Sequence, residues 1–209
     1  MKNFTAFLDS MKYTRFVVFH PFKGFWDLKH AKIGKIESAT VLTLLFSLVT
    51  ILRCQFTGFL FNTIDVMETN LLLVFLGSVL PILIWVLANW AITTLVDGEG
   101  TAKDIYIATA YSLVPYIVMS FVLVLLSNFM ILDEASIYYL LDGIGIVWSV
   151  LLLLVGMMTI HQFFVGKTLL TVFLALVGMV VILFVVLLFF SLVQQMINFF
   201  IVVWYEVAQ

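Results

Sequence analysis

The chain has 209 residues and is 64 % hydrophobic but only 11 % charged, with a mean hydropathy of +1.22. Soluble domains carry about 25 % charged residues, so this composition excludes a water-soluble fold, whose surface would lack polar side chains. The length corresponds to one domain, and the single cysteine, Cys54, excludes an intrachain disulfide. The net charge of −2 hides a strong asymmetry, because seven of the ten basic residues precede Ser38.

Residues 1–37 are predicted to form an amphipathic arm. Pro21 divides two apolar faces. Residues 1–36 contain seven basic residues and two acidic ones, Asp9 and Asp27, so their net charge is +5. The apolar positions are Phe4, Phe7, Leu8 and Met11 before Pro21, then Phe22, Phe25, Trp26, Ile33 and Ile36. Basic amphipathic helices lie in the interface of anionic leaflets. The arm is therefore a docking platform for a cytoplasmic partner, through residues such as Phe22 and Trp26, or an anchor for the first span.

Residues 38–209 are predicted to form a transmembrane domain of five helices. A helix of about 20 apolar residues crosses a hydrocarbon core of roughly 30 Å, and the apolar stretches lack the alternation of barrel strands. The fold class is therefore all-α, a polytopic membrane helical bundle. The predicted spans are Ala39–Phe61 (39–61), Leu71–Val96 (71–96), Ile105–Leu132 (105–132), Gly143–Val165 (143–165) and Thr168–Val193 (168–193).

The last apolar region continues to Tyr205, too far for one upright span. Gln194, Gln195 and Asn198 interrupt it. One interpretation places an interfacial tail at residues 196–205, because about ten residues cannot span again. The other is a single tilted helix that projects past the bilayer.

Charge predicts the orientation. With the N-terminus in the cytoplasm, the cytoplasmic segments carry nine basic residues and the opposite side carries none. That opposite side instead carries Asp65, Glu68, Asp133, Glu134, Asp142 and Glu206. The positive-inside rule therefore favours a cytoplasmic N-terminus and an external C-terminus.

Arg53 is the most costly residue in the predicted spans, at about +2.5 to +3.5 kcal/mol for a central Arg. It lies eight residues before Phe61. The hypotheses are snorkelling to the outer interface, pairing with Asp65 or Glu68, or a site for an anionic substrate or lipid headgroup.

Four further polar residues lie within the spans: Asn89, Asn128, His161 and Gln162. Asn89 and His161 both fall near cytoplasmic ends, where they could form a proton- or ligand-binding site. The alternative is that such side chains hydrogen-bond across helices and hold the bundle together.

Pro81 and Pro115 each lie eleven residues into their predicted spans, near the midplane. Paired proline-interrupted helices can mark transport sites. They can equally be static kinks whose freed carbonyls are covered by neighbouring helices.

Catalytic motifs are missing from the sequence. Gly166-Lys167-Thr168 resembles the end of a phosphate-binding loop, but the required leading glycine is replaced by His161. No H-E-x-x-H, paired-cysteine or G-x-S-x-G pattern occurs. We therefore expect no enzyme activity, no cofactor, no metal site and no nucleic-acid partner.

Three motifs together resemble the YIP family of five-span membrane proteins, over roughly residues 18–190. They are His20-Pro21-Phe22-Lys23-Gly24-Phe25, the loop from Asp97-Gly98-Glu99-Gly100 to Tyr111-Ser112-Leu113-Val114-Pro115, and Trp148 to His161. The resemblance implies a cytoplasmic N-terminus. Eukaryotic members are linked to Rab-type GTPases and vesicle traffic, but their long polar N-terminal domain and Asp-Leu-Tyr-Gly-Pro motif are missing here. The chain looks more like the short prokaryotic branch, for which the resemblance suggests association with carbohydrate ABC-type permeases.

The predicted function is an accessory or scaffold subunit of another membrane protein, in a bacterial plasma membrane and against its anionic cytoplasmic leaflet. The first alternative is a stand-alone transporter or lipid-handling protein that uses Arg53, Pro81, Pro115, Asn89 and His161. The second is an adaptor in vesicle traffic.

Overall fold

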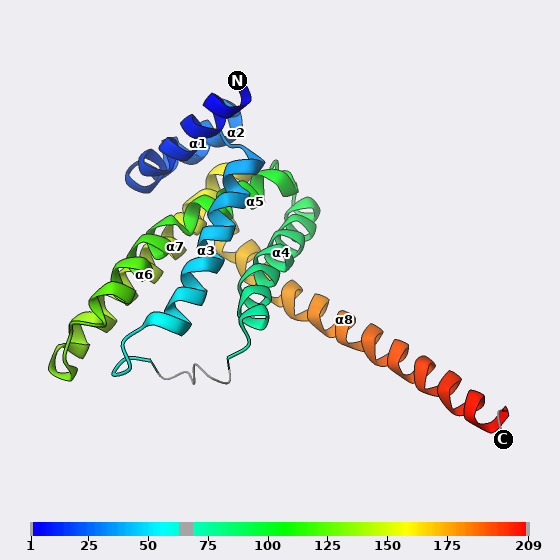
Figure 1. Cartoon of the computed structure of the whole chain (residues 1–209). Coiled ribbons are helices and arrows are strands. Elements are labelled where there is room, and N and C mark those ends of the chain that lie inside the picture. Colours follow the sequence, from blue (N-terminus) through cyan, green and yellow to red (C-terminus); the bar gives the residue numbers. More distant parts are fainter. Residues whose placement is uncertain (1, 63–68, 208–209) are drawn as a thin grey trace.

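The structure is a computed structural model that describes residues 2–62 and 69–207. Its regular elements, within those residues, are all helical (Figure 1). In chain order they are α1 (Lys2–Phe19), α2 (Pro21–His30), α3 (Ile36–Phe56), α4 (Leu71–Leu95), α5 (Ala102–Ser112), α6 (Val114–Leu126), the 3-10 turn η1 (Leu132–Glu134), α7 (Ala135–His161) and α8 (Val165–Val207).

Five helical segments among the described residues are long and apolar enough to cross a membrane. They are Ile36–Phe56, Leu71–Leu95, Ala102–Leu126, Leu132–His161 and Val165–Tyr205. This confirms the predicted all-α bundle with five transmembrane helices. The third segment consists of α5 and α6, and the fourth consists of η1 and α7.

The third and fourth segments differ from the predicted bounds. The third ends at Leu126 rather than Leu132, and the fourth begins at Leu132 rather than Gly143. Asp142, which the sequence placed in an external loop, therefore lies inside α7. The prediction began the span after the last acidic residue, because an unpaired carboxylate is costly in lipid.

Local signals explain where several helices begin and end. Asn70 starts α4, since its side-chain Oδ1 accepts hydrogen bonds from the main-chain N–H groups of Leu72 and Leu73. Thr101 and Asp104 form a reciprocal capping box at the start of α5. The helix is interrupted at Leu113, between α5 and α6, because Pro115 has no N–H to donate.

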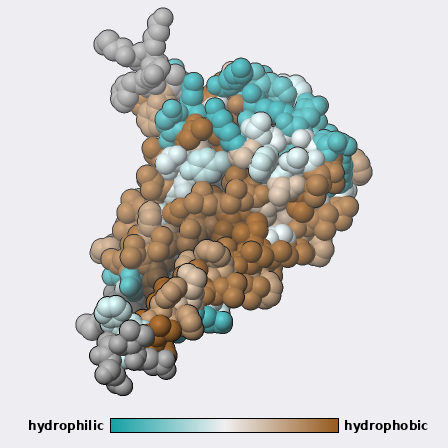
Figure 2. Space-filling model, turned by 90° about the vertical axis from the view of Figure 1, so that its right-hand side faces the viewer, coloured by the Kyte–Doolittle hydropathy of each residue, from teal (hydrophilic) through white to brown (hydrophobic). Residues whose placement is uncertain are grey.

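The arm packs on one end of the bundle. Val17 and Phe25 are fully buried, and the Phe25 ring lies against Gly156 of α7, where an added Cβ would come within 3.2 Å of it. Ser10 of α1 shares a 2.6 Å hydrogen bond with the Tyr111 hydroxyl of α5. Hydrophilic residues gather at this end of the molecule, and a hydrophobic surface extends below them (Figure 2).

The two arm helices are also joined to each other. Gly24 of α2 lies so close to α1 that an added Cβ would be 2.8 Å from the Cα of Val17. The Tyr13 hydroxyl donates a 2.6 Å hydrogen bond to Asp27. Burial, together with this bond to the Asp27 carboxylate, raises the pKa of Tyr13 above its ordinary value. The phenol therefore stays protonated and the link persists at neutral pH.

The predicted second apolar face of the arm has two different environments. Phe25 points into the bundle, whereas Phe22 and Trp26 are 58 % and 46 % exposed. The Trp26 ring stacks on His30 at a centroid distance of 3.8 Å.

Replacing Phe25 by Ala should release the arm from the bundle. Truncating a buried Phe typically costs about 3–5 kcal/mol, so the midpoint of thermal unfolding in detergent should fall by several degrees. Phe22→Ala is the matched control, because the same truncation at an exposed site should leave the midpoint nearly unchanged. If Phe25→Ala left the midpoint as little changed as Phe22→Ala does, the arm would not be docked on the bundle.

Candidate functional site

A group of charged and polar residues lies where the arm meets the loop after α4; we call it the arm-end cluster (Lys29, Glu99, Asp104 and His161). The Lys29 ammonium donates a 2.7 Å hydrogen bond to the carbonyl oxygen of Ile160 and lies 3.2 Å from Oε2 of Glu99. Its charge thus sits at the C-terminal end of α7, where the helix dipole favours a cation. The arm is thereby tied electrostatically to the bundle.

Two glycines allow the loop after α4 to pack on His161. The N–H of Gly100 donates to His161 Nδ1 over 3.2 Å. A Cβ on Gly98 would lie 2.7 Å from that nitrogen, and a Cβ on Gly100 would lie 2.6 Å from Cε1 of the same ring. No larger residue fits without displacing the imidazole. The sequence motif Asp97-Gly98-Glu99-Gly100 is therefore explained by close packing.

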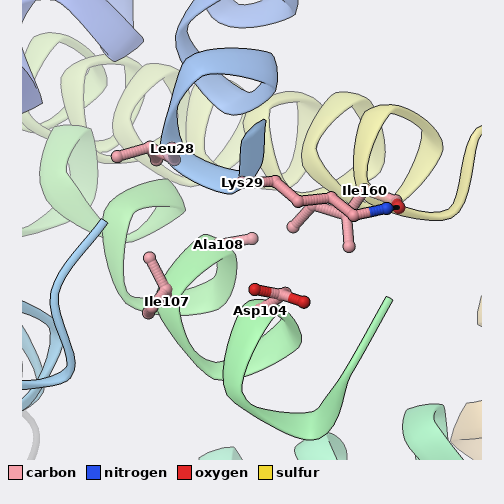
Figure 3. A pocket seen from close by; sticks show the side chains of 6 residues that line it. All are labelled: Leu28, Lys29, Asp104, Ile107, Ala108 and Ile160. Carbon is pink, nitrogen blue, oxygen red and sulfur yellow. Dashed lines mark hydrogen bonds between the residues drawn. The ribbon is translucent and has the colours of Figure 1, made fainter. Parts of the chain in front are cut away.

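The cavity inside this junction is small. Its volume is about 10 Å³, close to that of one water molecule. Figure 3 shows Lys29 reaching past it to the main chain at Ile160, with Asp104, Ile107 and Ala108 of α5 on the opposite wall. The arm and the bundle are therefore packed closely here, with no space for a ligand larger than water.

Polar residues near these helix ends have different partners. His161 belongs to the arm-end cluster, whereas the Tyr106 hydroxyl donates to Thr40 over 3.3 Å. Lys167 donates a 2.7 Å hydrogen bond to the carbonyl oxygen of Val96, the residue that follows α4.

Asn89 is 1 % exposed and lies on α4, one turn from Trp85 and one turn from Thr93. Both polar atoms of its amide, and Nε2 of His161, lack a hydrogen-bond partner among the described residues. An unsatisfied buried polar group costs about 1–3 kcal/mol. Asn128 differs, because its amide donates to the carbonyl oxygen of Phe56 across the α3–α6 contact.

Arg53 lies in a second polar site, inside the membrane-spanning bundle. Its Nη1 is 2.6 Å from Oδ1 of Asp142, and its Nη2 is 3.1 Å from Oδ2 of the same carboxylate. Nη1 also donates to the Tyr116 hydroxyl at 3.2 Å and to Ser120 Oγ at 3.1 Å. The guanidinium therefore joins α3 to both α6 and α7.

The structure gives Arg53 a partner that the sequence analysis did not name. Asp65 and Glu68, the partners named from the sequence, lie outside the described residues. The observed partner is Asp142, and the two side chains are only 22 % and 19 % exposed. Snorkelling to the outer interface is not needed, since a bidentate carboxylate already neutralises the charge within the bundle.

A cavity of about 250 Å³ adjoins this ion pair. Its walls include Thr50, Arg53, Cys54, Phe61, Tyr116 and Tyr138. Ligand pockets usually occupy about 300–1,000 Å³, so this cavity suits water or a very small polar molecule.

The two prolines do not share a site. Pro81 is exposed on the surface of α4, whereas Pro115 is buried at the start of α6. The interruption before Pro115 leaves main-chain N–H groups without helical partners, and Ser149 of α7 accepts from one of them, the N–H of Tyr116, over 3.0 Å. Pro115 therefore lies at a covered interruption of the helix.

The Yip1 domain family model matches residues 16–188. The chain belongs to the Yip1 domain family. This confirms the resemblance drawn from the three sequence motifs. No curated protein and no solved structure matches the chain.

The matched Yip1 domain contains both polar sites. It begins within α1 and ends within α8, so the arm-end cluster and the Arg53–Asp142 pair are parts of the domain. Together with the five apolar helices, membership of this family identifies an integral membrane protein.

Removing the Lys29 ammonium should loosen the arm. Lys29→Met should speed hydrogen exchange of the α2 amides several-fold, because the cap on α7 and the ion pair to Glu99 are both lost. Lys23→Met is the control, since Lys23 is exposed on the same helix. Unchanged exchange in Lys29→Met would mean that packing of Phe25 alone holds the arm.

The Arg53–Asp142 pair can be tested by a double-mutant cycle. Arg53→Met or Asp142→Leu alone should lower the free energy of unfolding by about 3–5 kcal/mol, because each leaves an unpaired buried charge. The double variant should lose much less than the sum. Unfolding in a detergent titration would measure this coupling, with Lys103→Met as an exposed control. Additive losses would show that the two charges do not interact.

Proposed function

We propose that this Yip1 domain protein is a non-catalytic accessory or scaffold subunit that binds another integral membrane protein. The observation that supports this proposal is that the second half of α8 is not covered by the other described residues.

α8 is much longer than a membrane span requires. Its 43 residues correspond to about 64 Å at 1.5 Å per residue, roughly twice the hydrocarbon thickness. The helix contacts α4 and α7 near its start, where Thr168, Thr171 and Ala175 are buried. No described residue of α8 after Ala175 is buried, and the helix runs away from the bundle (Figure 1).

The uncovered part of α8 carries one polar face; we call it the α8 stripe (Ser191, Gln194, Gln195 and Asn198). These positions follow the spacing i, i+3, i+4 and i+7, so they share one side of the helix. All four side chains are exposed. Within the stripe, Nε2 of Gln195 donates a 3.4 Å hydrogen bond to Oγ of Ser191. Amide side chains in membranes hydrogen-bond across helices. The stripe therefore offers a partner helix both apolar contact and polar pairing.

Residues 196–205 continue the same helix, because α8 extends without interruption to Val207. Placement of that segment at the far interface stays a prediction. A shallow helix of this kind would still present its polar face to a neighbouring protein.

The polar sites described above favour this role over a stand-alone transporter or lipid-handling protein. Arg53 is already neutralised by Asp142, and the adjoining cavity is about 250 Å³. The transport alternative rests on Arg53, Pro81, Pro115, Asn89 and His161, and this cavity is the space beside the first of them. Within the proposal, the partner is an ABC-type permease for carbohydrates, and the arm faces the cytoplasm of a bacterial plasma membrane.

Site-specific photo-crosslinking would test the proposed partner surface. A benzophenone side chain at Gln195 or Asn198, in the protein expressed in its own membrane, should crosslink one integral membrane protein, identified by mass spectrometry. Phe200 lies on the opposite side of the helix and provides the matched control, which should label lipid or nothing. The substitutions Gln194→Leu and Asn198→Leu should lower recovery of the same partner after gentle detergent extraction.

Other outcomes would contradict the proposal. Equal crosslinking from both faces would indicate non-specific contact. Crosslinks only to a second copy of the chain would indicate a homo-oligomer, and purified protein that moves a solute across liposomes alone would favour the transporter.

A further inference from the structure

A groove of about 430 Å³ lies between the arm and the bundle; we call it the arm groove. It is larger than the cavity beside Arg53 and is separate from both polar sites. Its lining residues include Arg15 and Phe19 of α1, Pro115 and Val118 of α6, and Gly145 and Trp148 of α7.

The floor of the arm groove forms where α6 and α7 approach closely. A Cβ on Gly145 would lie 2.9 Å from the Cβ of Met119, so a larger residue there would push these helices apart. The walls are open to the side of the molecule, since Val118 and Ile144 are 54 % and 51 % exposed. Both belong to membrane-spanning segments. The groove therefore opens toward the lipid phase.

Arg15 is the charged residue among those that line the groove. It is exposed, and the ion pairs formed by described residues, Lys29–Glu99 and Arg53–Asp142, do not involve it. α1 lies at the end of the molecule where hydrophilic residues gather (Figures 1 and 2). The groove thus combines the Arg15 cation, at the polar end of the molecule, with apolar walls.

We propose that the arm groove binds one anionic phospholipid of the leaflet next to α1. The phosphate group pairs with the Arg15 guanidinium, which suits phosphate oxygens by its planar set of donors. In an anionic lipid no headgroup cation offsets the phosphate charge, whereas choline does so in phosphatidylcholine. One acyl chain lies along Val118 and Ile144, and the Trp148 ring covers it. The arm, α6 and α7 would then be joined by a lipid as well as by protein contacts. This inference does not depend on the proposed partner-binding role.

Photoactivatable lipids would test this site on the full-length chain. The protein is reconstituted in phosphatidylcholine nanodiscs that contain a small fraction of phosphatidylglycerol with a diazirine in its acyl chain. Labelling should concentrate on the peptides of α6 and α7 that contain Val118 and Ile144. The same diazirine on phosphatidylcholine should label them much more weakly.

Two variants separate the charge from the shape of the groove. Arg15→Gln should reduce labelling about tenfold, as expected for loss of one charge-assisted contact. Val118→Trp should reduce it by filling the groove from an exposed position. Lys103→Gln, which removes an exposed cation outside the groove, should leave labelling unchanged.

The remaining outcomes overturn the proposal. Equal labelling by phosphatidylcholine would exclude recognition of an anionic headgroup. Labelling spread evenly over the transmembrane surface, or unaffected by Val118→Trp, would exclude the groove. The comparison of the two lipids uses the unmodified protein, so it stands even where a variant does not fold.

Discussion

The hydrocarbon core of a bilayer cannot hydrogen-bond to a polar group, and the interior of this protein is organised by that constraint. Arg53 enters the bundle because α7 supplies a bidentate carboxylate and α6 supplies two hydroxyl groups. The same requirement is met at the interruption before α6, where Ser149 accepts from the N–H of Tyr116. These contacts bring α3, α6 and α7 together in one register, which apolar side chains facing lipid would not specify.

At the arm end the constraint changes, because water and charge are available there. Lys29 and Lys167 each donate to a carbonyl oxygen near the end of a membrane-spanning helix, and Gly98 and Gly100 let the intervening loop pack on His161. Phe25 adds apolar contact beneath the arm. This end of the Yip1 domain is a compact joint with room for about one water molecule. A space of that size is far below the volume of usual ligand pockets.

Two surfaces remain for interactions beyond the chain itself, and they differ in chemistry. The α8 stripe is neutral and polar on an apolar helix, which suits another helix with its own hydrogen-bonding groups. The arm groove combines one guanidinium with an apolar channel, which suits a charged amphiphile. A subunit that holds a lipid beside its arm and a protein along α8 would link its partner to the composition of the leaflet.

The sequence by itself showed that this is an integral membrane protein, that its fold is helical, how many spans it has and which family it belongs to. Long apolar stretches and three motifs carry that information locally. It did not reveal the partner of Arg53, since Asp142 is 89 positions away and looked like a loop residue. Tertiary packing decided three other features. Phe25 is buried whereas Phe22 is exposed, Ser149 covers the helix interruption at Pro115, and α8 runs away from the bundle. Hydrophobicity is summed along a segment, whereas pairing, burial and helix direction depend on which distant segments meet in space.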